Sequence, residues 1–95
     1  MLLEQVKIFA HYGYRNQLHK LVEELRELET VILYDTENVE HIQEEMADVL
    51  NLIEQFMYGN QNWFGKILDI EEFKVKRQIE RIEQELEKQQ WTVNT

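Results

Sequence analysis

The feature that most restricts the fold of this chain is its lack of helix breakers. The 95 residues include no proline and only three glycines, so long helices can run without interruption. Leu, Glu, Gln, Lys and Ile, which favour helix, are frequent. Apolar residues make up 43% of the chain, which is enough for one folded domain of this size. These properties predict an all-α fold, an antiparallel bundle of about four helices.

Apolar periodicity divides the chain into segments. The expected helices cover residues 2–12, 14–34, 38–58 and 69–89. Gly13 ends the first of them, and residues 60–68 are expected to form a loop. In this loop, Trp63 and Phe64 would pack as a lid on the bundle or on a partner chain. The expected organisation is one domain and a C-terminal tail, at residues 1–90 and 91–95.

The charge of the chain argues against two classes of partner. A formal net charge of −9 disfavours binding to a nucleic-acid polymer or to a membrane surface, because both require a basic face. No segment is long and apolar enough to span a membrane, and the first residues do not resemble a secretory signal. The chain has no cysteine, so it can form neither a disulfide nor a thiolate metal site. We expect a cytoplasmic protein.

Two pairs of acidic residues are predicted to converge. One helical turn separates the members of each pair: Glu24 and Glu27, and Glu45 and Asp48. On a helical wheel, each pair lies roughly 105–110° to the same side of its apolar stripe. If Met46, Val49 and Leu50 clamp the third helix onto the second, both pairs face one side. Since the pairs are equally far from the turn near Thr36, they should also lie at the same height.

Such a cluster has two interpretations. Acids beside an apolar stripe are often only the solvated face of an amphipathic helix. Alternatively, four carboxylates held close together need a counter-charge, and a hard cation such as Mg²⁺ prefers oxygen ligands. Other metal chemistries fit less well, because the chain has no Glu-x-x-His or HExxH motif. The histidines are expected to be surface or core-edge residues.

Further polar residues could contact a ligand beside this cluster. Gln17 and Lys20 precede the acidic pair of the second helix, and Asn51 follows that of the third. On the fourth helix, Lys74 and Arg77 lie on the face opposite the apolar stripe. These cations either pair with acids on the helix surface or bind phosphate oxygens.

Three segments within residues 12–82 resemble a known family. They are YGYRNQLHKLVEELRELETVI, EEMADVLNLIEQ and EFKVKRQIERI, which are similar to the MazG-like branch of the all-α nucleoside triphosphate pyrophosphatases. An EExxE stretch followed by an ExxD stretch is typical of that family. Here EELRE and EMAD supply the acids of these motifs: Glu23, Glu24 and Glu27, then Glu45 and Asp48.

The resemblance implies a fold, an assembly and a reaction. The helical bundle would be completed by dimerisation, as a homodimer or a dimer of dimers. The reaction would be hydrolysis of an NTP or dNTP to a monophosphate and pyrophosphate. The cofactor would be Mg²⁺, with Mn²⁺ as a substitute, bound by Glu24, Glu27, Glu45 and Asp48.

The resemblance also implies residue roles. Glu23 or Glu24 would accept the proton of the attacking water. Lys74 and Arg77 would contact the phosphates. The resemblance assigns no role to Gln17, Lys20 and Asn51, which either bind the substrate from their positions beside the acids or are ordinary exposed polar residues of the helices. The motifs do not specify the base-stacking residues, for which the candidates are Tyr12, Tyr14, Trp63 and Phe64.

Two other functions stay open from the sequence. One is a non-catalytic helical module that dimerises and binds a partner protein. The other is a nucleotide sensor that binds NTP with Mg²⁺ and releases no product. An enzyme needs the acidic residues for turnover, whereas a module should tolerate Gln or Asn in their place.

Overall fold

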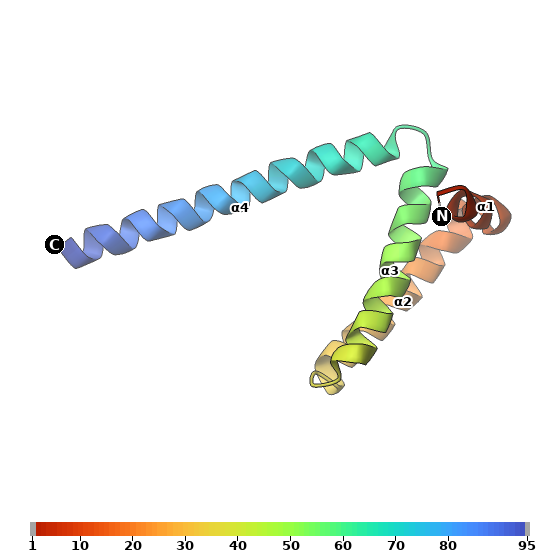
Figure 1. Ribbon diagram of the computed structural model, residues 1–95, viewed down its shortest axis with the longest axis horizontal. Helices are drawn as coiled ribbons and strands as arrows, with labels where there is room; N and C mark the ends of the chain where they lie inside the picture. The colour runs from red at the N-terminus through yellow and green to blue at the C-terminus, as the bar shows by residue number, and fades with distance from the viewer. Residues whose placement is uncertain (1, 95) are drawn as a thin grey trace. The chain divides into compact units, whose positions relative to one another are not determined.

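The computed structural model describes the backbone of residues 2–94 and the side chains of residues 3–90 (Figure 1). Within this range it contains four α-helices and no strand: α1 (Leu2–Tyr12), α2 (Tyr14–Tyr34), α3 (Val39–Gly59) and α4 (Trp63–Asn94). The predicted all-α fold class is therefore confirmed. The chain divides into two compact units, Met1–Trp63 and Phe64–Thr95, and each is described by itself.

The first three helices have the predicted bounds to within one residue. Gly13 separates α1 from α2 with φ of 90°, a conformation that glycine adopts without steric cost. Asn38 is the N-cap of α3, and its side-chain oxygen accepts a hydrogen bond from the backbone N–H of His41 at 3.1 Å. Local signals therefore account for these boundaries.

The predicted start of the fourth helix is wrong. Helix α4 begins at Trp63 rather than at Asp69, and the connection before it is reduced to Asn60–Asn62. Asn62 makes the turn with a positive φ of 72°, which Asn tolerates better than most residues. The segment contains no proline, and Gly65 costs a helix only about 1 kcal/mol relative to Ala, so the helix forms through it.

The predicted end of the fourth helix is also wrong. The backbone stays helical to Asn94 instead of fraying near Gln89. The side chains of the expected tail, residues 91–95, lie outside the described residues.

In the first unit, α2 and α3 form an antiparallel hairpin, and α1 packs against both helices (Figure 1). The buried apolar side chains are Phe9, Val31, Val49, Leu52 and Phe56. The Phe9 and Phe56 rings pack edge to face at 5.1 Å, and Trp63 stacks on Phe56 at 5.9 Å. The predicted lid of Trp63 and Phe64 is thus confirmed for Trp63 alone, because Phe64 belongs to the second unit. A Cβ at Gly59 would lie 2.6 Å from Phe9 Cδ1, so the glycine permits this packing.

The face through which α2 and α3 meet differs from the predicted one. Met46 and Leu50, which were expected to clamp the hairpin, are 51% and 55% exposed, whereas Val49 is buried. The buried positions of α2 are Gln17, Glu24 and Val31. The faces through which α2 and α3 contact each other therefore include buried polar positions and leave some of the most apolar positions exposed. Two of the buried polar side chains pair across the helix contact, since the Gln17 and Gln55 amides form a hydrogen bond of 2.7 Å. Among the described residues, Glu24 does not pair across it, and its Oε1 lies 3.3 Å from Lys20 Nζ on the same helix.

The second unit is the amphipathic helix α4. Its apolar stripe is exposed: Val75, Ile79, Ile82 and Leu86. On its polar face, Lys76 pairs with Glu72 at 3.3 Å, and the Arg77 guanidinium lies 5.7 Å from the centroid of the Phe73 ring. A search of the described residues finds no helix with the length and apolarity needed to cross a membrane.

Candidate metal centre and adjoining pocket

Four carboxylates meet on one side of the α2–α3 hairpin. Each of them offers an oxygen, and these oxygens all lie within 4.8 Å of one another: Glu24, Glu27, Glu45 and Asp48. The predicted convergence is therefore confirmed. Its basis in the chain is the equal distance of the two pairs from the α2–α3 turn, which sets them at one height in an antiparallel hairpin.

Each of the two inner carboxylates, Glu24 and Glu45, has one buried oxygen that is unsatisfied among the described residues. Glu24 is only 7% exposed, and the side chain of Glu45 is 14% exposed. Oε2 of each residue is inaccessible to solvent and has no hydrogen-bond partner among the described residues. A buried carboxylate oxygen without a partner is costly, so these two atoms indicate that a positive group belongs between them.

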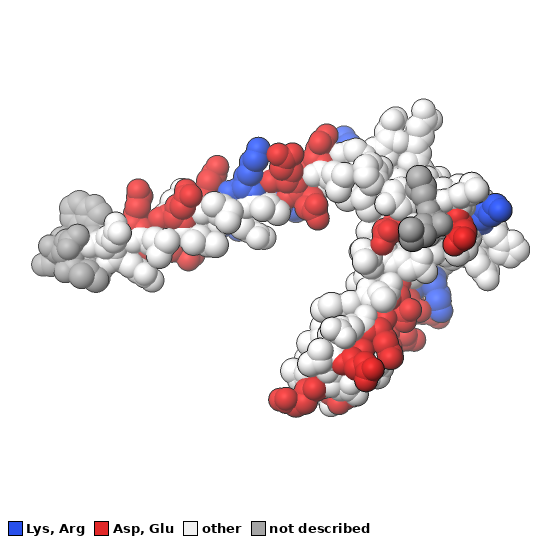
Figure 2. All heavy atoms as spheres, viewed as in Figure 1, with Lys and Arg blue, Asp and Glu red and all other residues white. Residues whose placement is uncertain are grey.

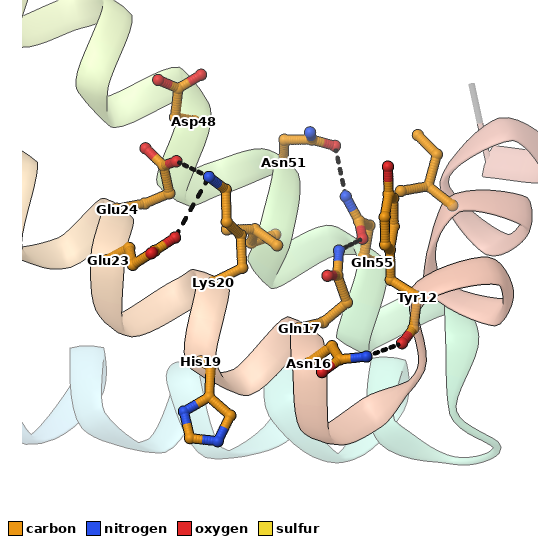
Figure 3. Close-up of a pocket in the computed structure, with 12 residues that line it drawn as sticks. Tyr12, Asn16, Gln17, His19, Lys20, Glu23, Glu24, Asp48, Asn51 and Gln55 are labelled. Atoms are coloured by element: carbon orange, nitrogen blue, oxygen red, sulfur yellow. Dashed lines mark hydrogen bonds and ion pairs between the residues drawn. The ribbon is translucent and has the colours of Figure 1, made fainter.

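The other oxygen of each inner carboxylate faces a basic side chain. Lys20 Nζ lies 3.3 Å from Glu24 Oε1 and 3.4 Å from Glu23 Oε2 (Figure 3). His41 Nε2 lies 3.4 Å from Glu45 Oε1, while its Nδ1 lies 3.6 Å from Asp35. Each inner carboxylate is therefore paired with a basic group through one oxygen, while its other oxygen is unpartnered among the described residues.

Burial raises the pKa of the Glu24 carboxyl. The hydrogen bond from Lys20 opposes this rise, whereas the neighbouring charges of Glu27 and Asp48 add to it. The same contact acts on the lysine, since hydrogen bonding to Glu24 and Glu23 raises the pKa of Lys20. Without a cation, the cluster therefore disfavours the ionised form of Glu24.

The cluster fits a hard divalent cation. All four donors are carboxylates, which are the ligands that Mg²⁺ and Mn²⁺ accept, and two of them have oxygens that nothing else satisfies. Figure 2 shows Asp and Glu side chains gathered over the α2–α3 hairpin with few Lys or Arg beside them. This negative surface attracts cations.

A pocket of about 620 Å³ adjoins the cluster (Figure 3). Glu24 and Asp48 form its acidic end. The three polar residues that the sequence suggested as ligand contacts all line it: Gln17, Lys20 and Asn51. Ile8 and Tyr12 of α1 contribute apolar surface on the opposite side. A second pocket of about 300 Å³, which Glu27 and Glu45 help to line, opens on the other side of the cluster.

The remaining predicted site residues lie elsewhere. Glu23 is exposed at the edge of the first pocket beside Lys20 and is not part of the four-carboxylate cluster. Tyr14 and Trp63 pack on Phe56, with ring centroids 5.6 and 5.9 Å away. The other three candidates belong to the second unit, so their roles stay predictions: Phe64, Lys74 and Arg77.

Sequence reasoning missed two residues of the site. Gln55 is the most buried polar side chain, at 2% exposed, and it joins Gln17 to Asn51. His41 holds Glu45. In both cases the signal was the i,i+4 spacing, Asn51 with Gln55 and His41 with Glu45, which places the two side chains on one helix face.

Comparison with known proteins adds no assignment. No protein-family model matches the chain, and neither the curated proteins nor the solved structures include a match to it.

Proposed function

We propose that this protein is a metal-dependent nucleoside triphosphate pyrophosphohydrolase of the MazG-like kind, which converts NTP or dNTP to monophosphate and pyrophosphate in the cytoplasm. The observation that carries the proposal is the pair of buried, unpartnered oxygens of Glu24 and Glu45 within a cluster of four carboxylates. The acids of a solvated helix face would expose their oxygens to water. A cation gives these two atoms a partner.

Different residues would bind the cation, accept the proton and bind the substrate in such a reaction. The cation ligands are Glu24, Glu27, Glu45 and Asp48. When bound, Mg²⁺ or Mn²⁺ neutralises phosphate charge and acidifies the attacking water. Glu23, exposed at the pocket edge, accepts the water's proton. Lys20 faces the pocket and pairs with phosphate oxygens, and Gln17 and Asn51 hold the nucleoside.

We propose further that the working form is a homodimer or a dimer of dimers. Support comes from the exposed apolar residues on neighbouring helices of the first unit: Leu18, Val22 and Leu25 on α2, and Met46, Leu50 and Ile53 on α3. Exposed apolar residues in this number are typical of a protein interface, and burying apolar surface stabilises by about 25 cal/mol per Å². The stripe of α4 adds a second such surface.

The direct test is product analysis. The purified protein is incubated with Mg²⁺ and a panel of NTPs and dNTPs, and pyrophosphate and monophosphate are measured separately. We expect equal amounts of both products and no activity in EDTA. Orthophosphate as the sole phosphate product, or no product from any nucleotide, would refute the proposed reaction.

Matched variants test the site. Glu45→Gln removes a buried ligand and should lower kcat/KM by at least about a hundredfold, because a carboxylate that holds the metal acts in every step. Glu44→Gln changes the adjacent exposed acid of α3 and should leave activity within about twofold. Equal activity of the two variants would contradict the assignment of the cluster.

A second candidate function is a non-catalytic module that dimerises and binds a partner protein. The exposed apolar faces of α2, α3 and α4 favour it. In that case Glu45→Gln would leave the assembly and partner binding intact, and the wild-type protein would release no pyrophosphate. A nucleotide sensor would bind NTP with Mg²⁺ and likewise release none.

A further inference from the structure

The pocket beside the acidic cluster has a wall of linked amides. Gln17 Nε2 donates to Gln55 Oε1 at 2.7 Å, and Gln55 Nε2 donates to Asn51 Oδ1 at 3.4 Å (Figure 3). Gln17 and Gln55 are buried at 5% and 2% exposed. All three side chains line the pocket. An amide relay of this kind holds its members in single orientations, because each hydrogen bond specifies which end of the next amide faces it.

The direction of the relay is set outside the pocket. Gln5 Nε2 of α1 lies 3.5 Å from both Glu54 Oε2 and Asn51 Oδ1. An ionised carboxylate can only accept, so Glu54 requires the nitrogen end of Gln5 at this position. Gln5 then donates to Asn51, whose oxygen must therefore face Gln5 and Gln55. The relay runs from Glu54 through Gln5, Asn51 and Gln55 to Gln17.

This direction determines which polar groups remain for a ligand. With its oxygen engaged twice, Asn51 has Nδ2 available as a donor. With its nitrogen engaged by Gln55, Gln17 has Oε1 available as an acceptor. A reversed relay would exchange the two. The relay therefore contributes one donor and one acceptor to the pocket in a defined arrangement, and planar heterocycles present complementary N–H and acceptor groups on one edge.

We propose that the relay reads the nucleobase, with Gln17 and Asn51 touching the base edge and Gln55 and Glu54 as positioning residues. This inference rests on the proposed function for its ligand class, a nucleotide whose phosphates lie at the carboxylate end. Base choice is then set partly by Glu54, a half-buried residue that does not line the pocket. Discrimination arises because a base of the wrong pattern leaves a polar group unpaired.

The test compares base discrimination in three variants. Gln55→Glu keeps the acceptor for Gln17 but cannot donate to Asn51, and Glu54→Gln removes the group that sets the direction. Gln43→Leu, at an exposed position of α3, is the control. The kcat and KM are measured for nucleotides that differ only in the base, together with thermal melts to confirm folding.

We expect the wild type and Gln43→Leu to separate the best from the worst base by at least about tenfold in kcat/KM. Glu54→Gln and Gln55→Glu should lower this ratio to below about threefold. These two variants should change KM. Their kcat for the best base should stay within about threefold of the wild-type value, because the four carboxylates are unchanged. Loss of stability alone would lower activity equally for every base. Unchanged discrimination in the folded Glu54→Gln variant would overturn the inference.

A binding measurement separates this inference from the proposed reaction. Nucleoside monophosphates are titrated in EDTA by calorimetry, which requires neither metal nor turnover. Base-selective binding that Gln55→Glu abolishes would support the relay even if no nucleotide were hydrolysed. Hydrolysis of all bases with equal efficiency, or equal affinity of the wild type for every monophosphate, would refute the relay while leaving the reaction intact.

Discussion

Replacement of Glu24 by Gln should stabilise the protein in the absence of Mg²⁺ and destabilise it, relative to the wild type, when Mg²⁺ is added. Glu24 Oε2 is buried without a partner among the described residues, and Glu27 and Asp48 are its charged neighbours. Gln has nearly the same shape, carries no charge, and can donate to one of these carboxylates. In EDTA, the variant should therefore be more stable than the wild type. In Mg²⁺, the wild type should be more stable, because only its carboxylate binds the cation.

The magnitudes follow from two opposing contributions. A buried unsatisfied polar group costs about 1–3 kcal/mol, and the solvent-screened ion pair with the exposed Lys20 offsets only part of this cost. The net gain for Glu24→Gln in EDTA is thus about 1 kcal/mol, which raises the Tm by about 4–8 °C in a domain of this size. At a Mg²⁺ concentration of 100 times Kd, the wild type gains about 2.7 kcal/mol by mass action.

The assay is thermal unfolding followed by circular dichroism, at pH 7.5, in EDTA and across a Mg²⁺ titration. Glu29→Gln, at an exposed site on the same helix, is the matched control and should follow the wild type in both conditions. A Glu24→Gln protein that is less stable than the wild type in EDTA would show that the carboxylate is satisfied without a cation. An equal Mg²⁺ shift in both proteins would show that the cation binds elsewhere.

Three further results are expected. In EDTA, the stability advantage of Glu24→Gln over the wild type should grow as the pH rises from the ordinary carboxyl pKa of 4.5. Because the pKa of Glu24 is raised in the folded state, the native wild type binds more protons than the unfolded chain and is destabilised as these protons leave. A difference in stability between the two proteins that shrinks from pH 4.5 to 8 would contradict the direction of the pKa shift. Gly59→Ala should destabilise by about 1–3 kcal/mol in urea unfolding, because its Cβ would lie 2.6 Å from buried Phe9. Gly65→Ala, with open space around it, should be neutral or stabilising by up to about 1 kcal/mol, and equal effects of the two would refute the packing argument. If the protein forms the proposed dimer, Leu50→Lys should shift it toward monomer in light scattering, because Leu50 is exposed on α3, and an unchanged mass would remove this face from the proposed interface.

Much of the fold could be predicted from local signals. The absence of proline and the apolar periodicity predicted four helices, and Gly13 predicted where the first ends and the second begins. The start of α4 was mispredicted because Asp69 resembles an N-cap. A helix that is already formed passes through such a residue at little cost, since an internal Asp loses well under about 1 kcal/mol of helix propensity.

The candidate site was predicted correctly for a partly wrong reason. Equal spacing from the α2–α3 turn brought Glu24, Glu27, Glu45 and Asp48 together, as expected. The helical wheel, however, treated the acids as flanking an apolar seam through Met46 and Leu50, whereas Glu24 lies in the contact face itself. Apolar content does not identify the contact face when buried polar groups can pair with each other across it.

The sequence by itself determined the helices, the spacing of the acids and the negative charge, because each depends on residues within a few turns of one another. Tertiary structure alone decided which oxygens are buried without a partner, since that depends on how α2 packs on α3. It alone also decided the amide relay, which joins Gln5 to residues more than forty positions away. Desolvation and hydrogen-bond direction arise only when distant segments meet, and these two effects define the chemistry of the pocket.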